Sequence, residues 1–259
     1  MADVTEVLDS LQRLAPTWLA GSWDNVGLLV RGRLGVQRIG VCIDLTDAVY
    51  EELASQGCDF IVAYHPPIFG GLKRLVGANT SQRVVMRALA EGRHIYAPHT
   101  ALDAATGGMG EWLAEGLGAS TDVRPIEPNT TSPEQGMGRR GELAPPTTVR
   151  ALLPRLKEHL GLEHVRVAGA LDVPRTSFAV CPGAGGSLFE KLRGIDLYVT
   201  GEMRHHDVLA KVAAGASVIL TDHTNTERGY LPKLKVWLED DLDVEVVVST
   251  IDVDPLSVC

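Results

Sequence analysis

Apolar residues recur along the chain in two patterns that predict alternating helices and strands. Residues 4–14 place apolar side chains at helical spacing, ahead of Pro16. Short, nearly continuous apolar runs are typical of strands that helices cover on both faces. These runs lie at 37–43, 59–63, 94–97, 164–169, 177–181, 195–200, 217–221 and 243–250. The alternation predicts the α/β class, with two similar α/β lobes whose mainly parallel sheets are covered by helices.

One segment, residues 127–146, breaks this alternation. It is rich in proline and glycine and has little apolar periodicity, which predicts a linker or a long surface loop. A helical pattern resumes at 147–160, where Pro154 predicts a kink or a break.

Composition narrows the class of protein further. The chain has 259 residues, with 24 basic against 33 acidic side chains and a net charge of -9. A clustered positive surface is what duplex binding needs, so we expect no general nucleic-acid binding. No apolar run reaches the roughly 18–20 residues that span a bilayer, and no targeting segment is apparent at the N-terminus. We therefore expect no membrane association and a cytoplasmic location, with the nucleus as the alternative.

Histidines and carboxylates follow several predicted strands directly. Ligands of open α/β sheets bind at the carboxyl ends of strands, and imidazole and carboxylate groups are common metal ligands. Asp103 follows His99 by four positions, and Glu227 follows His223 by four, a spacing that puts both on one face of a helical turn. The residues of this kind at strand ends are His65, His99, Asp103, Glu202, His205, His206, His223 and Glu227. Two carboxylates with two or three histidines would suit a site for two metal ions.

Plainer interpretations of the same residues stay open. A histidine at a strand end is often a hydrogen-bonded structural residue, and the His223/Glu227 pair fits a carboxylate at a helix start beside a surface histidine. The turn Gly183–Ser187 could cradle a phosphate through its N–H groups, or could be a tight turn before a helix.

Five segments together resemble one known family. They are SWDNVGLLV at 22–30, YHPPIF at 64–69, PHTALDAA at 98–105, TGEMRHHDVL at 200–209 and DHTNTERGYL at 222–231. In their order and in their residues they are similar to the NGG-one-interacting factor three-like family, in its eukaryotic-type branch. Bacterial members of that family carry the label GTP cyclohydrolase I type 2.

The resemblance implies a two-lobed α/β protein with a dinuclear metal centre between the lobes, assembled as a homohexamer. By motif, the metal ligands fall on His65, Asp103, His223 and Glu227. Tyr64 stands where the family has a further histidine, so one of two divalent ions (Zn, Mn, Fe or Mg) should bind weakly, unless Tyr64 or His99 serves as a ligand. For the chain end to reach this centre, residues 1–126 and 217–259 should form one lobe and residues 127–216 the other.

The function implied is a metal-dependent hydrolase acting on a nucleotide or a phosphorylated small molecule. His205 or His206 would move protons, and Glu202 would orient one of them. The alternative is a non-enzymatic, metal-stabilised ring that presents a surface to transcription-related proteins.

Overall fold

The computed structural model describes residues 2–258, which form two compact units. Of the described residues, unit 1 comprises 2–102 and Tyr230–Pro255, and unit 2 comprises Asp103–Gly229 and 256–258. Residues 103–126 and 217–229, which we expected in the first lobe, therefore lie in unit 2. The reason is strand pairing, because 120–128 and 217–220 both pair within the second sheet.

Unit 1 is built on a five-stranded sheet in the order β1-β4-β3-β2-β11. Neighbouring strands are parallel except β1, which runs antiparallel to β4. The strands are β1 (Gly27–Val30), β2 (Arg38–Cys42), β3 (Phe60–Ala63), β4 (His94–Ala97) and β11 (Glu245–Val248). β3 and β4 are buried along their whole length, as expected of strands covered on both faces.

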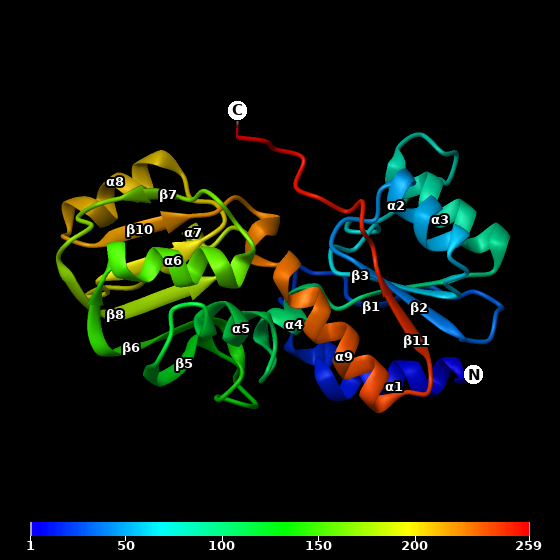
Figure 1. The fold of residues 1–259 in the computed structure, drawn as a ribbon. Helices are drawn as coiled ribbons and strands as arrows, with labels where there is room; N and C mark the ends of the chain where they lie inside the picture. The colour runs from blue at the N-terminus through cyan, green and yellow to red at the C-terminus, as the bar shows by residue number, and fades with distance from the viewer. Residues whose placement is uncertain (1, 259) are drawn as a thin grey trace. The chain divides into compact units, whose positions relative to one another are not determined.

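Four helices cover this sheet. They are α1 (Val4–Leu14), α2 (Asp47–Ser55), α3 (Thr80–Glu91) and α9 (Leu231–Asp241), and a 3-10 turn, η1 (Thr17–Leu19), follows α1. Figure 1 shows α2 and α3 on one face, and α1 beside α9 on the other, where Arg13 pairs with Asp241 at 2.5 Å. Thr46 caps α2 by accepting a hydrogen bond from the Val49 N–H.

Unit 2 is built on a six-stranded sheet in the order β5-β6-β8-β9-β10-β7. Only β8–β9 and β9–β10 are parallel pairs, so this sheet is mixed and not mainly parallel. Its strands are β5 (Ser120–Pro128), β6 (Gly136–Thr148), β7 (Arg166–Ala168), β8 (Pro174–Cys181), β9 (Leu197–Thr200) and β10 (Ser217–Leu220). The chain as a whole is α/β with two sheets, as predicted.

The helices of unit 2 are short apart from two. They are α5 (Met109–Glu115), α6 (Val149–Leu160), α7 (Gly186–Phe189) and α8 (His205–Ala213), with the 3-10 turns η2 (Thr224–Thr226) and η3 (Arg228–Tyr230), and α4 (His99–Ala104) precedes them in the chain. α5 packs against β6 and β8, α6 against β6, and α8 against β10. Within residues 2–258, no helix combines the length and the apolar character that crossing a bilayer requires.

The predicted linker is wrong for most of its length, because residues 127–128 and 136–146 belong to the antiparallel pair β5–β6, and only 129–135 form the loop between them (Figure 1). Its prolines lie where a sheet tolerates them. Pro128 lies on the edge strand β5, Pro133 lies in the loop, and Pro145 and Pro146 lie where the register of β6 against β8 shifts. α6 likewise runs unbroken through Pro154.

Candidate metal site

The turn after β10 brings His223 and Glu227 together in unit 2. The 3-10 turn η2 lies between them, and the imidazole Nε2 is 3.7 Å from the carboxylate Oε1. Glu227 is 1% exposed, whereas the His223 side chain is 37% exposed. A carboxylate this deeply buried is costly unless it is paired or coordinates a metal. The pair offers one nitrogen and one oxygen donor, and could hold a metal ion.

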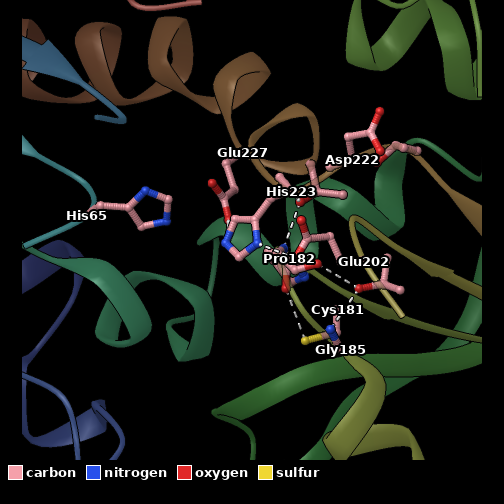
Figure 2. Close-up of polar contacts among 12 residues, drawn as sticks. His65, Cys181, Pro182, Gly185, Glu202, Asp222, His223 and Glu227 are labelled. Atoms are coloured by element: carbon pink, nitrogen blue, oxygen red, sulfur yellow. Dashed lines mark hydrogen bonds and ion pairs between the residues drawn. The ribbon is translucent and has the colours of Figure 1, made fainter. Parts of the chain in front are cut away.

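Glu202, at the end of β9, fixes the orientation of His223. Its Oε2 lies 3.2 Å from His223 Nδ1, which leaves Nε2 on the side of Glu227. Figure 2 shows His223 with the Glu227 carboxylate on one side and Glu202 on the other. A carboxylate that holds one imidazole nitrogen while the other meets the ion is the usual environment of a metal-binding histidine.

The two predicted proton carriers, His205 and His206, lie apart from this contact. His205 and His206 are exposed in the first turn of α8, with ring centres 5.5 Å apart. Glu202, which we expected to orient one of them, contacts His223 instead. The reason is geometric, because β9 and β10 are parallel neighbours whose carboxyl ends lie side by side.

The glycine-rich turn after β8 packs against the His223 and Glu227 side chains. Gly183 has φ +58°, and a Cβ atom there would lie 2.9 Å from His223 Nε2 and 3.0 Å from Glu227 Oε1. Its N–H donates to Thr226 Oγ1 (2.8 Å), and the Gly185 N–H donates to Thr200 Oγ1 (2.9 Å). These two N–H groups are engaged within the protein and are not open to a phosphate, which favours the tight-turn interpretation.

Asp103 and Glu227 both act electrostatically on Cys181, the last residue of β8. Burial, and then the charges of Asp103 and Glu227, raise the pKa of the Cys181 thiol. Asp103 is 6% exposed and lies next to Ala104 and Ala105, whose carbonyls accept hydrogen bonds from Arg139. Of the predicted ligands in unit 2, the structure brings His223 and Glu227 into contact, whereas Asp103 is linked to Glu227 only through the charge that both exert on Cys181.

The predicted ligand His65 lies in unit 1, directly after β3. Its Nδ1 is 2.9 Å from Asp44 Oδ1, the same carboxylate arrangement as at His223. His99 follows the neighbouring strand β4, and its ring centre is 5.4 Å from that of His65. Tyr64 is 2% exposed, with its ring 5.0 Å from His65 and 5.4 Å from His99.

Asp24 holds the His99 ring through a contact with its Nδ1 atom. Its side chain is fully buried, and Oδ1 lies 2.8 Å from His99 Nδ1. Burial raises the pKa of Asp24, but hydrogen bonds from His99 and Thr100 hold it below its usual range. Asp24 and Asp44 were not among the predicted residues, because nothing local links them to histidines 75 and 21 positions away.

Beside His223, unit 2 also contains a cavity of about 600 Å³. Glu202 lines it and also bonds His223, so the cavity adjoins the candidate ligand. The other charged groups on its wall are Arg166, Glu190, Arg204 and Asp207.

Comparison with known proteins gives a consistent picture. Residues 2–255 match the model of the Duf34/NIF3 family, described as NGG1p interacting factor 3. The chain belongs to this family. It is 42% identical to Protein NIF3 homolog of Schizosaccharomyces pombe, over 92% of each chain. It is also 35% identical to NGG1-interacting factor 3 of Saccharomyces cerevisiae, over 99% of this chain and 97% of the relative.

A solved structure of a Bacillus cereus protein related to NIF3 has the same fold. Its TM-score is 0.86 at 20% identity, covering 100% of this chain and 99% of the other. At that identity the likeness concerns the fold alone, so the chemistry of the Duf34/NIF3 chain has to be argued from its own residues.

Proposed function

We propose that this protein binds two divalent metal ions through His65, Asp103, His223 and Glu227, and is a metal-dependent hydrolase of a nucleotide or a phosphorylated small molecule. The observation that carries the proposal is the His223–Glu227 pair. Its two donor atoms are 3.7 Å apart, with Nδ1 of His223 held by Glu202 and the carboxylate of Glu227 buried.

The donor set fits such ions. Imidazole nitrogens and carboxylate oxygens suit Zn, Mn, Fe and Mg alike, so the residues do not select one metal. When bound, divalent ions lower the pKa of a water molecule to give a nucleophile and stabilise charge on a leaving oxygen.

The chain's own side chains have three tasks in this proposal. Glu202 keeps the proton of His223 on Nδ1, so that Nε2 is available as a ligand. The adjoining cavity binds the substrate, with arginine and carboxylate groups on its wall. Proton transfer is assigned to His205 or His206, which lie exposed at the start of α8, two and three positions after the cavity residue Met203.

The deciding experiment is a screen of purified, metal-reconstituted protein against nucleotides and phosphoesters, with elemental analysis of the same samples. We expect turnover of at least one compound, loss of turnover when a chelator removes the metal, and recovery when metal is restored. Retained metal with no turnover of any compound would contradict the hydrolase.

Asp103→Ala tests the ligand assignment directly. We expect bound metal to fall to half of the wild-type amount or less, because one carboxylate ligand is lost. Elemental analysis measures it, and circular dichroism checks that the variant folds. Asp172→Ala is the control, because Asp172 forms an exposed ion pair with Arg150. Unchanged metal in Asp103→Ala would refute its role.

Tyr64 is proposed as a hydrogen-bond donor near the site and not as a ligand, since a phenol of ordinary pKa, near 10, is a poor ligand at neutral pH. We expect metal titration of the wild-type protein to show two unequal steps. Tyr64→Phe should leave the stronger step unchanged, and Tyr64→His should strengthen the weaker one by supplying an imidazole. Loss of both steps in Tyr64→Phe would instead show that the phenolate binds the metal.

A second candidate function is a metal-stabilised homohexameric scaffold for transcription-related proteins, in the cytoplasm or the nucleus. The yeast relative's name, NGG1-interacting factor 3, favours it. In that case the ions are structural and closed to substrate. Sedimentation of the metal-loaded and chelated protein distinguishes the two, since a metal-stabilised ring should dissociate when the ions are removed.

A further inference from the structure

His99 is held in a backbone conformation that few side chains adopt. Its φ is +31°, and its side chain is 15% exposed. Residues with positive φ other than glycine persist only when their surroundings fix them, and they gather at functional sites. The rings of Trp23, Phe69 and Tyr64 lie around the imidazole, with centres 6.2, 6.3 and 5.4 Å from its own.

The fixed conformation directs Nδ1 of His99 onto a carboxylate. Asp24 Oδ1 is 2.8 Å away, and the Asp24 side chain is fully buried. The other carboxylate oxygen accepts from the Thr100 N–H and hydroxyl, so the carboxylate itself cannot turn away. A histidine whose Nδ1–H is held by a carboxylate offers Nε2 as a lone-pair donor.

His65 is arranged in the same way on the neighbouring strand end. Its Nδ1 meets Asp44 at 2.9 Å, and the two imidazoles are 5.4 Å apart between centres, at 75°. Two imidazoles bound to one tetrahedral ion at about 2.0–2.1 Å each have ring centres roughly 5 Å apart. The spacing of His65 and His99 therefore suits a shared ion.

The proposed site has too few ligands for two ions and needs a further nitrogen donor. Four residues shared between two ions leave fewer than the three protein ligands that a catalytic ion usually has. Tyr64, next to both imidazoles, is a weak substitute.

We propose that His99, fixed through Nδ1 by Asp24, is a fifth protein ligand and binds through Nε2 the same ion as His65. This rests on the proposed function, because it presupposes that His65 binds a metal. It goes beyond that function by giving the weaker ion a second imidazole from this chain.

Cobalt(II) titration of chelator-treated protein tests it, followed by visible absorption and by elemental analysis. We expect His99→Ala to weaken one step about tenfold or more and to leave the other unchanged. His99→Gln keeps a donor for Asp24 but no imidazole, so it should behave in the same way even if His99→Ala folds poorly. His164→Ala is the control, because His164 is exposed and its nearest carboxylate is 4.0 Å away.

Rescue separates a ligand from a merely structural role. Adding Tyr64→His to His99→Ala should restore the weakened step, and X-ray absorption of the zinc form should show one imidazole fewer in His99→Gln than in the wild type. Identical titrations of wild type, His99→Ala and His99→Gln would overturn the assignment of His99 while leaving the other ligands in place. A wild-type protein that takes up no metal would overturn the proposed function and this assignment with it.

Discussion

Replacing Arg139 with methionine is expected to lower the free energy of unfolding by about 3–5 kcal/mol, because it leaves several buried carbonyls without a donor and removes the ion pair with Glu111 (3.3 Å). Arg139 is 1% exposed on β6. Its Nη1 donates to the carbonyls of Gly136 and Gly138 (2.7 and 2.8 Å), and its Nη2 to those of Ala104 and Ala105 (3.2 and 3.1 Å). Methionine fills the space but leaves these buried carbonyls without a donor.

A urea titration followed by circular dichroism measures the loss. Arg140→Met is the matched control, because Arg140 is the next residue of the same strand but is only half buried, and we expect a change below about 1 kcal/mol there. Arg139→Lys should fall between them, since one ammonium cannot reproduce the guanidinium fork. Equal stability of the two methionine variants would contradict the role given to Arg139.

The burial of Arg139 could not be predicted from the sequence. Arg139 and Arg140 look like one short basic pair inside a proline-rich linker, and nothing local distinguishes them. Strand pairing separates them, because successive side chains of β6 point to opposite faces. The pairing depends on contacts with β5 and β8, which a local pattern does not contain.

The elements with long apolar patterns were predictable from the sequence. The parallel strands β2, β3, β9 and β10 and the helix α1 lie where periodicity places them. In an α/β unit such strands are buried by the helices between them, so the local pattern and the final burial agree. The antiparallel strands β5 and β6 carry prolines, whose cost is avoided by an edge position and a register shift that only the folded sheet defines.

The donor residues of the candidate site were predictable from the sequence, but the carboxylates that hold the histidines in place were not. His223 and Glu227 follow a strand at a spacing that indicates a shared face, and the structure brings them together. Glu202 was expected near the site, but as the partner of His205 or His206, whereas it contacts His223. The carboxylates that hold His65 and His99 come from other loops, so only the fold identifies them.

Gly183 packs directly against the two donor atoms of the His223–Glu227 pair. The turn Gly183–Ser187 stands out as glycine-rich in the sequence, but the need for glycine at position 183 comes from residues 40 and 44 positions later. A Cβ atom there would approach His223 Nε2 to 2.9 Å and Glu227 Oε1 to 3.0 Å, closer than ordinary contacts allow. Hydrogen bonds to Gly183 from the Thr200 hydroxyl and the Glu202 N–H, at its carbonyl, keep the backbone from moving away.

Gly183→Ala is therefore expected to weaken metal binding by about 10- to 100-fold, the range found when the groups that position metal ligands are altered. The added methyl group must displace both donor atoms, because the buried turn behind it cannot shift. Isothermal titration with zinc measures the affinity. Gly161→Ala is the matched control, because Gly161 has a similar φ, +68°, with nothing within 4 Å of the added atom. Both variants should lose about 1 kcal/mol of stability from the left-handed backbone alone, so an equal metal affinity in the two would show that Gly183 does not position the pair.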